Sequence, residues 1–131
     1  MTRSAGDKNG YEVNPTNAYT SDGALAVDNN SGTNSSTNCT NNGKDKHHFY
    51  NYTISLPNGA TVKGIDVRWD AKVNATSGSP QICVQLSWNG GMTWTNAKST
   101  TRLTTSEATY ILGSATDNWG HAWMVMFFKG L

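Results

Sequence analysis

The chain has 131 residues, of which 15% are charged, and its formal net charge is +1. This length fits one domain with a two-layer core. The near-neutral charge provides no basic field for nucleic acid or anionic lipid, and no apolar run is long enough to span a membrane. The chain is rich in Asn, Thr, Ser and Gly and carries five Trp and five Tyr. Extracellular all-β proteins often have this composition, so we expect a secreted protein, part of a larger one.

The first 45 residues predict little regular structure. Residues 1–10 indicate a flexible leader to a single domain at 11–131. A turn at residues 14–17 interrupts any early strand, and Ala24 to Val27 is the first short strand. Residues 28–45, DNNSGTNSSTNCTNNGKD, are nearly free of apolar side chains and therefore predict a long surface loop.

Two segments with period-2 alternation follow. Residues 48–56 predict a strand with Tyr50, Tyr52, Ile54 and Leu56 on one face. Residues 61–73 predict another, with Ile65, Val67, Trp69, Ala71 and Val73 on one face and Asp66, Arg68 and Asp70 on the other.

Residues Gln81 to Trp94, QICVQLSWNGGMTW, predict a β-hairpin. Ile82, Val84, Leu86 and Trp88 alternate with polar or small residues, and Asn89-Gly90-Gly91 supplies residues that tolerate positive φ. Ser87 to Trp94 resembles the Asp-box hairpin motif, S-x-D-x-G-x-T-W, of sialidases, with Asn89 at the position of the Asp. The motif occurs once and is structural in those enzymes, so the resemblance implies a hairpin and no sialidase activity.

The rest of the chain predicts a strand at Ala108 to Leu112, a loop from Gly113 to Gly120, and a dense apolar run at Ala122 to Phe128. Short strands separated by turn signals favour an all-β fold, an antiparallel β-sandwich that is jelly-roll-like.

Four phrases together carry a family resemblance. These are GYEVNPTNAYTSDGALAVDNNSG, HHFYNYTISLPNGATVKGIDVRWDA, GSPQICVQLSWNGGMTWT and ATYILGSATDNWGHAW. They resemble β-sandwich modules of large secreted or surface-attached bacterial and environmental (metagenomic) proteins, which are similar to jelly-roll carbohydrate-binding modules. Such modules continue past the W-G-x-x-W segment, whereas only MVMFFKGL follows here. A missing C-terminal strand would leave an exposed edge that invites a homodimer.

The two cysteines, Cys39 and Cys83, are either free buried thiols or a disulfide. An oxidising compartment favours the disulfide, which would close a long loop.

Catalytic and metal-binding patterns are weak. Asp66 and Asp70 share a strand face about 13 Å apart, too far for a glycosidase pair, with Arg68 between them. We therefore expect no enzyme. Adjacent His47 and His48 point to opposite faces of a strand and cannot chelate one ion. Asp22, Asp28 and Asn29 could hold a structural calcium ion or form ordinary Asx turns.

Carbohydrate binding is the function that the resemblance and the aromatic content favour. Sugars stack on aromatic rings and bond to a few polar groups. The candidate rings are Trp69, Trp88, Trp119, Trp123, Tyr50 and Tyr52. Trp119 lies in a polar loop and should be the most exposed of them, whereas Trp94 should pack under its own hairpin.

Two functions therefore remain. The first is a non-catalytic module that binds a plant or microbial polysaccharide of the β-glucan type. The second is a structural or adhesive module of a cell-surface protein with no sugar site. The exposure of four tryptophans separates the two functions. The first function is favoured if two of them are exposed close together on one face, and the second is favoured if no two are. The four are Trp69, Trp88, Trp119 and Trp123.

Overall fold

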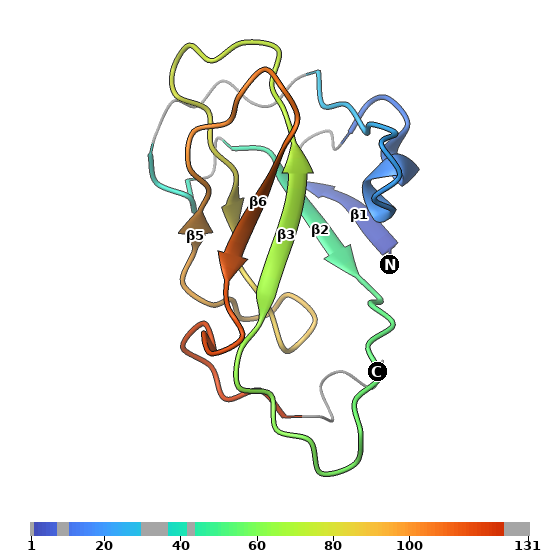
Figure 1. The fold of residues 1–131 in the computed structure, drawn as a ribbon, viewed down its shortest axis with the longest axis vertical. Coiled ribbons are helices and arrows are strands. Elements are labelled where there is room, and N and C mark those ends of the chain that lie inside the picture. The colour runs from blue at the N-terminus through green and yellow to red at the C-terminus, as the bar shows by residue number, and fades with distance from the viewer. Residues whose placement is uncertain (1, 8–10, 30–36, 42–43, 125–131) are drawn as a thin grey trace. The chain divides into compact units, whose positions relative to one another are not determined.

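A computed structural model describes residues 2–7, 11–29, 37–41 and 44–124. The described residues form three small antiparallel sheets and a single turn of 3-10 helix, so the fold is all-β (Figure 1). The chain divides into two compact units, Met1–Thr53 and Ile54–Leu131. No helix in the described part is long and apolar enough to cross a membrane.

The first unit contains β1 (Thr2–Asp7), the 3-10 turn η1 (Pro15–Tyr19) and β2 (Lys46–Tyr50). The strands β1 and β2 are antiparallel, so part of the segment predicted as a leader belongs to a sheet. The predicted turn at residue 14 is confirmed, because Asn14 has a φ of 48° and η1 follows it directly.

Two predicted strands of this unit are shorter in the structure. Ala24 to Val27 contributes one isolated bridge, between Val27 and Val13. The strand predicted over residues 48–56 ends at Tyr50. Asn51 then adopts a φ of 58°, a left-handed conformation that no strand can continue through.

The second unit is built on the pair β3 (Asp66–Ala71) and β6 (Ala108–Gly113). Both strands lie where strands were predicted, but β3 is shorter than the predicted 61–73. They are antiparallel, with Asp66 opposite Gly113 and Ala71 opposite Ala108. The predicted alternation is confirmed, since Val67 and Trp69 pack against the core while Arg68 is exposed.

The hairpin contains β4 (Cys83–Val84) and β5 (Lys98–Ser99), and its pairing extends well beyond these two short strands. Leu103 N donates to Pro80 O at the open end, and Thr95 N donates to Leu86 O nearer the turn. Ile82, Val84 and Leu86 all contribute to the core, which confirms the predicted face.

Two threonines hold the hairpin in register with their side chains. Thr100 N donates to Ile82 O (2.9 Å), Ile82 N donates to Thr100 Oγ1 (3.1 Å), and Gln81 Nε2 donates to Thr100 O (2.6 Å). The same three bonds recur nearer the turn among Gln85, Leu86 and Thr95. We name each set a Gln–Thr clasp. Both threonines are buried, so the clasps satisfy polar groups that water does not reach.

Side-chain hydrogen bonds hold the hairpin turn. Ser87 Oγ accepts from Gly91 N (2.8 Å), and Asn89 Oδ1 accepts from Thr93 N (2.8 Å). Asn89 Nδ2 also donates to Thr93 Oγ1 (3.0 Å). An amide oxygen can accept as a carboxylate does, so Asn89 replaces the Asp of the motif without loss of the turn.

The core of the second unit joins its two sheets. Val84 from β4, Leu112 from β6 and Trp119 from the following loop form one buried cluster. Beside this cluster, the backbone of Gly113 lies so close to Ile65 that only glycine fits. A Cβ on Gly113 would lie 2.2 Å from Ile65 O, and Gly113 also has a φ of +85°. A Cβ on Gly64 would likewise lie 2.4 Å from backbone atoms of Ser114 and Ala115. The chain between β6 and Trp119 thus packs directly against the start of β3.

Both cysteines are disulfide-bonded, and since the chain has only two, the bond is Cys39–Cys83. The disulfide prediction is therefore confirmed. The apolar run predicted at 122–128 lies largely outside the described residues, and with it the predicted homodimer edge.

Candidate functional site

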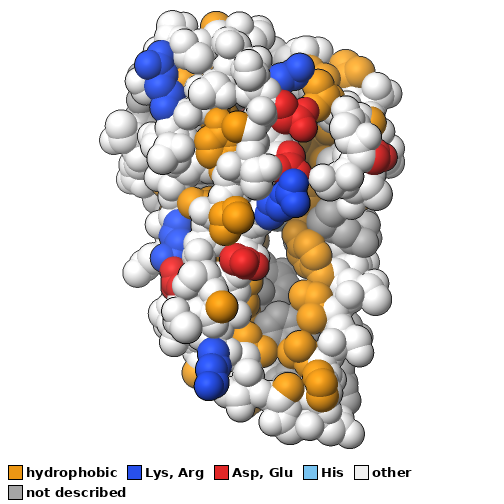
Figure 2. Space-filling view, in the orientation of Figure 1, with side chains coloured by type: hydrophobic (Ala, Val, Ile, Leu, Met, Phe, Trp, Pro, Cys, Tyr) orange, Lys and Arg blue, Asp and Glu red, His pale blue; other side chains and the backbone are white. Residues whose placement is uncertain are grey.

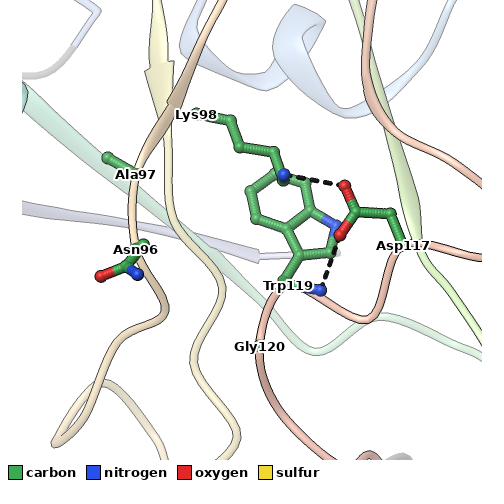
Figure 3. Close-up of a pocket in the computed structure, with 6 residues that line it drawn as sticks. All are labelled: Asn96, Ala97, Lys98, Asp117, Trp119 and Gly120. Carbon is green, nitrogen blue, oxygen red and sulfur yellow. Dashed lines mark hydrogen bonds and ion pairs between the residues drawn. The ribbon is translucent and has the colours of Figure 1, made fainter.

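A small pocket lies where the loop after β6 meets β5 in the second unit (Figure 3). Its volume is about 200 Å³, and it is lined by Asn96, Ala97, Lys98, Asp117, Trp119 and Gly120. The space is smaller than the pockets that usually hold small molecules, about 300 Å³ and more.

The two charged groups of the pocket neutralise each other. Lys98 Nζ lies 2.7 Å from Asp117 Oδ2 and 5.1 Å from the centre of the Trp119 ring. Asp117 Oδ1 accepts from the backbone N–H of Trp119 (2.9 Å). The hydrogen bonds from Lys98 and then from Trp119 hold the pKa of Asp117 below its ordinary value of 3.8. Both carboxylate oxygens therefore already have partners within the loop and the hairpin.

Sequence reasoning did not select Lys98 or Asp117, which are nineteen positions apart. Asp117 could have been found from its position two residues before Trp119, because at this spacing an Asp side chain accepts a hydrogen bond from a backbone N–H. Lys98 gave no comparable signal.

The prediction that Trp119 is the most exposed ring is wrong. Trp119 is 5% exposed, and its Nε1 donates to Ile65 O (2.8 Å). Asp117 O accepts from Ile65 N (3.0 Å), so both backbone groups of Ile65 are bound by the loop. The polar residues around Trp119 build the turn, while the ring enters the core.

The remaining tryptophan candidates are also covered. Trp123 is 7% exposed, and its Nε1 donates to Asn118 O (2.8 Å). Trp88 stacks on His121 at 3.8 Å, and both rings meet Trp123 edge-on. Trp69 is half-buried against the core. The structure thus brings Trp88 and Trp123 together in an aromatic cluster in which Trp123 is buried and Trp88 is half-buried.

Exposed rings occur elsewhere. Tyr50 is 44% exposed and Tyr52 is 53% exposed, so both predicted tyrosines are accessible in the first unit. Trp94 is 37% exposed and lies against Gly91, within its own hairpin as predicted. It is the one tryptophan of the described chain with an exposed side chain.

The three residues predicted for calcium each have a different partner. Asp22 accepts from Ala24 N and from Thr20 Oγ1, both at 3.0 Å, and these two bonds lower its pKa. This is the Asx turn that the sequence left open as the alternative. Asp28 Oδ2 lies 3.3 Å from His47 Nε2, and Asn29 N donates to Glu12.

No other metal cluster takes their place. Within residues 2–7, 11–29, 37–41 and 44–124, no three His, Cys, Asp or Glu side chains are arranged to hold an ion. His47 pairs with Asp28 and stacks on Tyr11 at 4.2 Å, which makes it part of the packing of the first unit.

Arg68 pairs with one of the two carboxylates that share its face of β3. Arg68 Nε donates to Asp70 Oδ1 (3.1 Å), and Thr109 Oγ1 donates to the same oxygen (2.6 Å). Asp70 is thereby bound by its neighbours across β3 and β6, and Asp66 lies further along the strand.

A comparison with protein-family models, curated proteins and solved structures found no match for this chain.

Proposed function

We propose that this protein is a non-catalytic β-sandwich module, jelly-roll-like in topology, that acts as a structural or adhesive unit of a larger extracellular protein. The observation that carries the proposal is that the four candidate tryptophans are buried or half-buried. None of Trp69, Trp88, Trp119 and Trp123 is exposed, so no pair of tryptophans offers a stacking platform for a sugar chain.

The tryptophans have a structural use that accounts for their number. The indole N–H groups of Trp119 and Trp123 each bind a backbone oxygen, and their rings fill space between short strands. Large rings compensate for the small amount of regular structure, because each aromatic side chain buries about 150–250 Å².

The disulfide supports the extracellular part of the proposal. Disulfides persist in oxidising compartments and are rare where thiols are kept reduced.

Polysaccharide binding is the second candidate, and the exposure of Tyr50 and Tyr52 favours it. Two accessible rings two residues apart could stack on sugar units, with the amide of Asn51 between them as a polar partner. The site would then use the tyrosines of the sequence prediction and none of its tryptophans.

Affinity electrophoresis against a panel of soluble glucans separates the two functions. A structural or adhesive module migrates at the same rate with and without polysaccharide. Retardation of the natural chain that is lost in a Tyr50→Ala/Tyr52→Ala variant would replace our proposal with the second candidate. The variant Thr53→Ala is the matched control, because Thr53 is an exposed neighbour without a ring.

A further inference from the structure

The segment that follows β2 is accessible over several consecutive residues. Residues 51–55 are all exposed, and the structure assigns no strand or helix between Asn51 and Ile65. Tyr52 and Ile54 are 53% and 44% exposed. Figure 2 shows hydrophobic side chains on the surface along this segment. The protein thus presents aromatic and aliphatic side chains on irregular backbone.

The backbone of this segment is also available. Among the described residues, Tyr52 to Leu56 take part in no hydrogen bond, and the nearest turn bond joins Ala60 N to Pro57 O. Proteases bind their substrates as extended chains and cleave first where the backbone is exposed and unbonded. Tyr50 differs from Tyr52, because it belongs to β2 and pairs with Thr2.

The position of this segment in the chain gives cleavage a defined result. Along the chain, the division between the two compact units falls between Thr53 and Ile54, one peptide bond beyond the bond that follows Tyr52. That bond lies between Cys39 and Cys83, which are linked by the disulfide. Each product of a cut after Tyr52 therefore keeps one half of the disulfide and matches one unit to within one residue, Thr53.

We propose that the Tyr52–Thr53 peptide bond is a processing site for a chymotrypsin-like protease, one that accepts an aromatic side chain before the cut. Hydrolysis adds one water: the hydroxyl joins the carbonyl carbon of Tyr52, and the nitrogen of Thr53 becomes an amine. The product is a two-chain form of the module, held together by Cys39–Cys83. This inference concerns maturation and holds whichever binding function the module has.

Other aromatic positions are poorer substrates. Tyr110 and Trp119 are buried, and Tyr110 lies within β6. Trp94 is partly exposed, but the next residue, Thr95, is buried and bonded to Leu86 through its N–H and its hydroxyl. A protease would have to open the hairpin to reach that bond.

Limited digestion of the natural, oxidised protein with chymotrypsin tests the proposal. We expect the first internal cut, read by intact-mass spectrometry, to follow Tyr52. A non-reducing gel should show one band near the intact mass of 14.2 kDa, and a reducing gel should show two smaller bands. The tryptophan emission of the cut protein should match that of the intact protein. The variant Tyr52→Ser should slow this first cut at least tenfold, whereas Tyr50→Ser should leave its rate unchanged.

Three results would overturn the proposal. The first is an initial internal cut at another position, such as after Trp94. The second is separation of the fragments without reductant. The third is loss of the native tryptophan emission on cleavage, which would mean that the cut requires unfolding.

Discussion

The Gln–Thr clasp at Thr100 allows a stability prediction to be worked from individual atoms. Thr100→Val keeps the shape of the side chain but removes Oγ1, the acceptor of the Ile82 N–H. Thr100 is 4% exposed, so water cannot replace the lost partner easily. A buried donor left without an acceptor costs about 1–3 kcal/mol. At about 4 °C per kcal/mol for a chain of this size, Tm should fall by about 4–12 °C.

The assay is urea and thermal unfolding followed by tryptophan emission, with Thr101→Val as the matched control. Thr101 is exposed and makes no hydrogen bond with the described residues, so its substitution should change the free energy of unfolding by less than about 0.5 kcal/mol. Thr95→Val should repeat the effect at the second clasp. If Thr100→Val is no more destabilising than Thr101→Val, the clasps do not support the hairpin, and the reasoning fails.

Three further variants test other parts of the fold. Gly113→Ala should destabilise the protein by more than about 3 kcal/mol in urea unfolding, because its Cβ would overlap a backbone oxygen. The control is Gly59→Ala, which has a similar φ but open space around it and should cost only about 1–2 kcal/mol. Equal costs for the two variants would contradict the overlap. Since hydrogen bonding lowers the pKa of Asp117 in the folded state, its contribution is present above pH 3.8 and is lost as pH falls through the lowered pKa. Tm measured across this acid range should therefore decrease less in Asp117→Asn than in the natural chain, and identical profiles would refute the assignment. Cys39→Ser should lower the free energy of unfolding by about 4 kcal/mol in the chain-entropy model, and chemical reduction of the natural protein should have the same effect; an unchanged midpoint in both would show that the bond adds nothing.

Local patterns in the sequence predicted the elements whose residues interact with near neighbours. The alternation along β3 and along residues 82–86 identified the buried faces correctly, because side chains of a strand alternate whatever lies opposite. The turn at Asn89 was equally predictable from the sequence, because its hydrogen bonds join residues at most four positions apart.

Long-range contacts decided the features that sequence reasoning missed. Trp119 stands in a polar loop, and its burial depends on a backbone oxygen of Ile65, fifty-four positions earlier. The strand predicted through Tyr52 ends because Asn51 is left-handed, a conformation that alternation alone does not reveal. The predicted tryptophan platform for a sugar failed for the same reason, because the exposure of a ring depends on the long-range contacts of the packed chain.

The loop that binds Ile65 also occupies the backbone hydrogen-bonding groups at the start of β3. The N–H and C=O of a residue at the start of a strand can template the addition of another chain, as happens in strand-mediated aggregation. Here Asp117 O and Trp119 Nε1 occupy both groups of Ile65. The chain therefore covers this end of β3 itself, and a variant such as Trp119→Phe, which lacks the indole N–H, would uncover one acceptor.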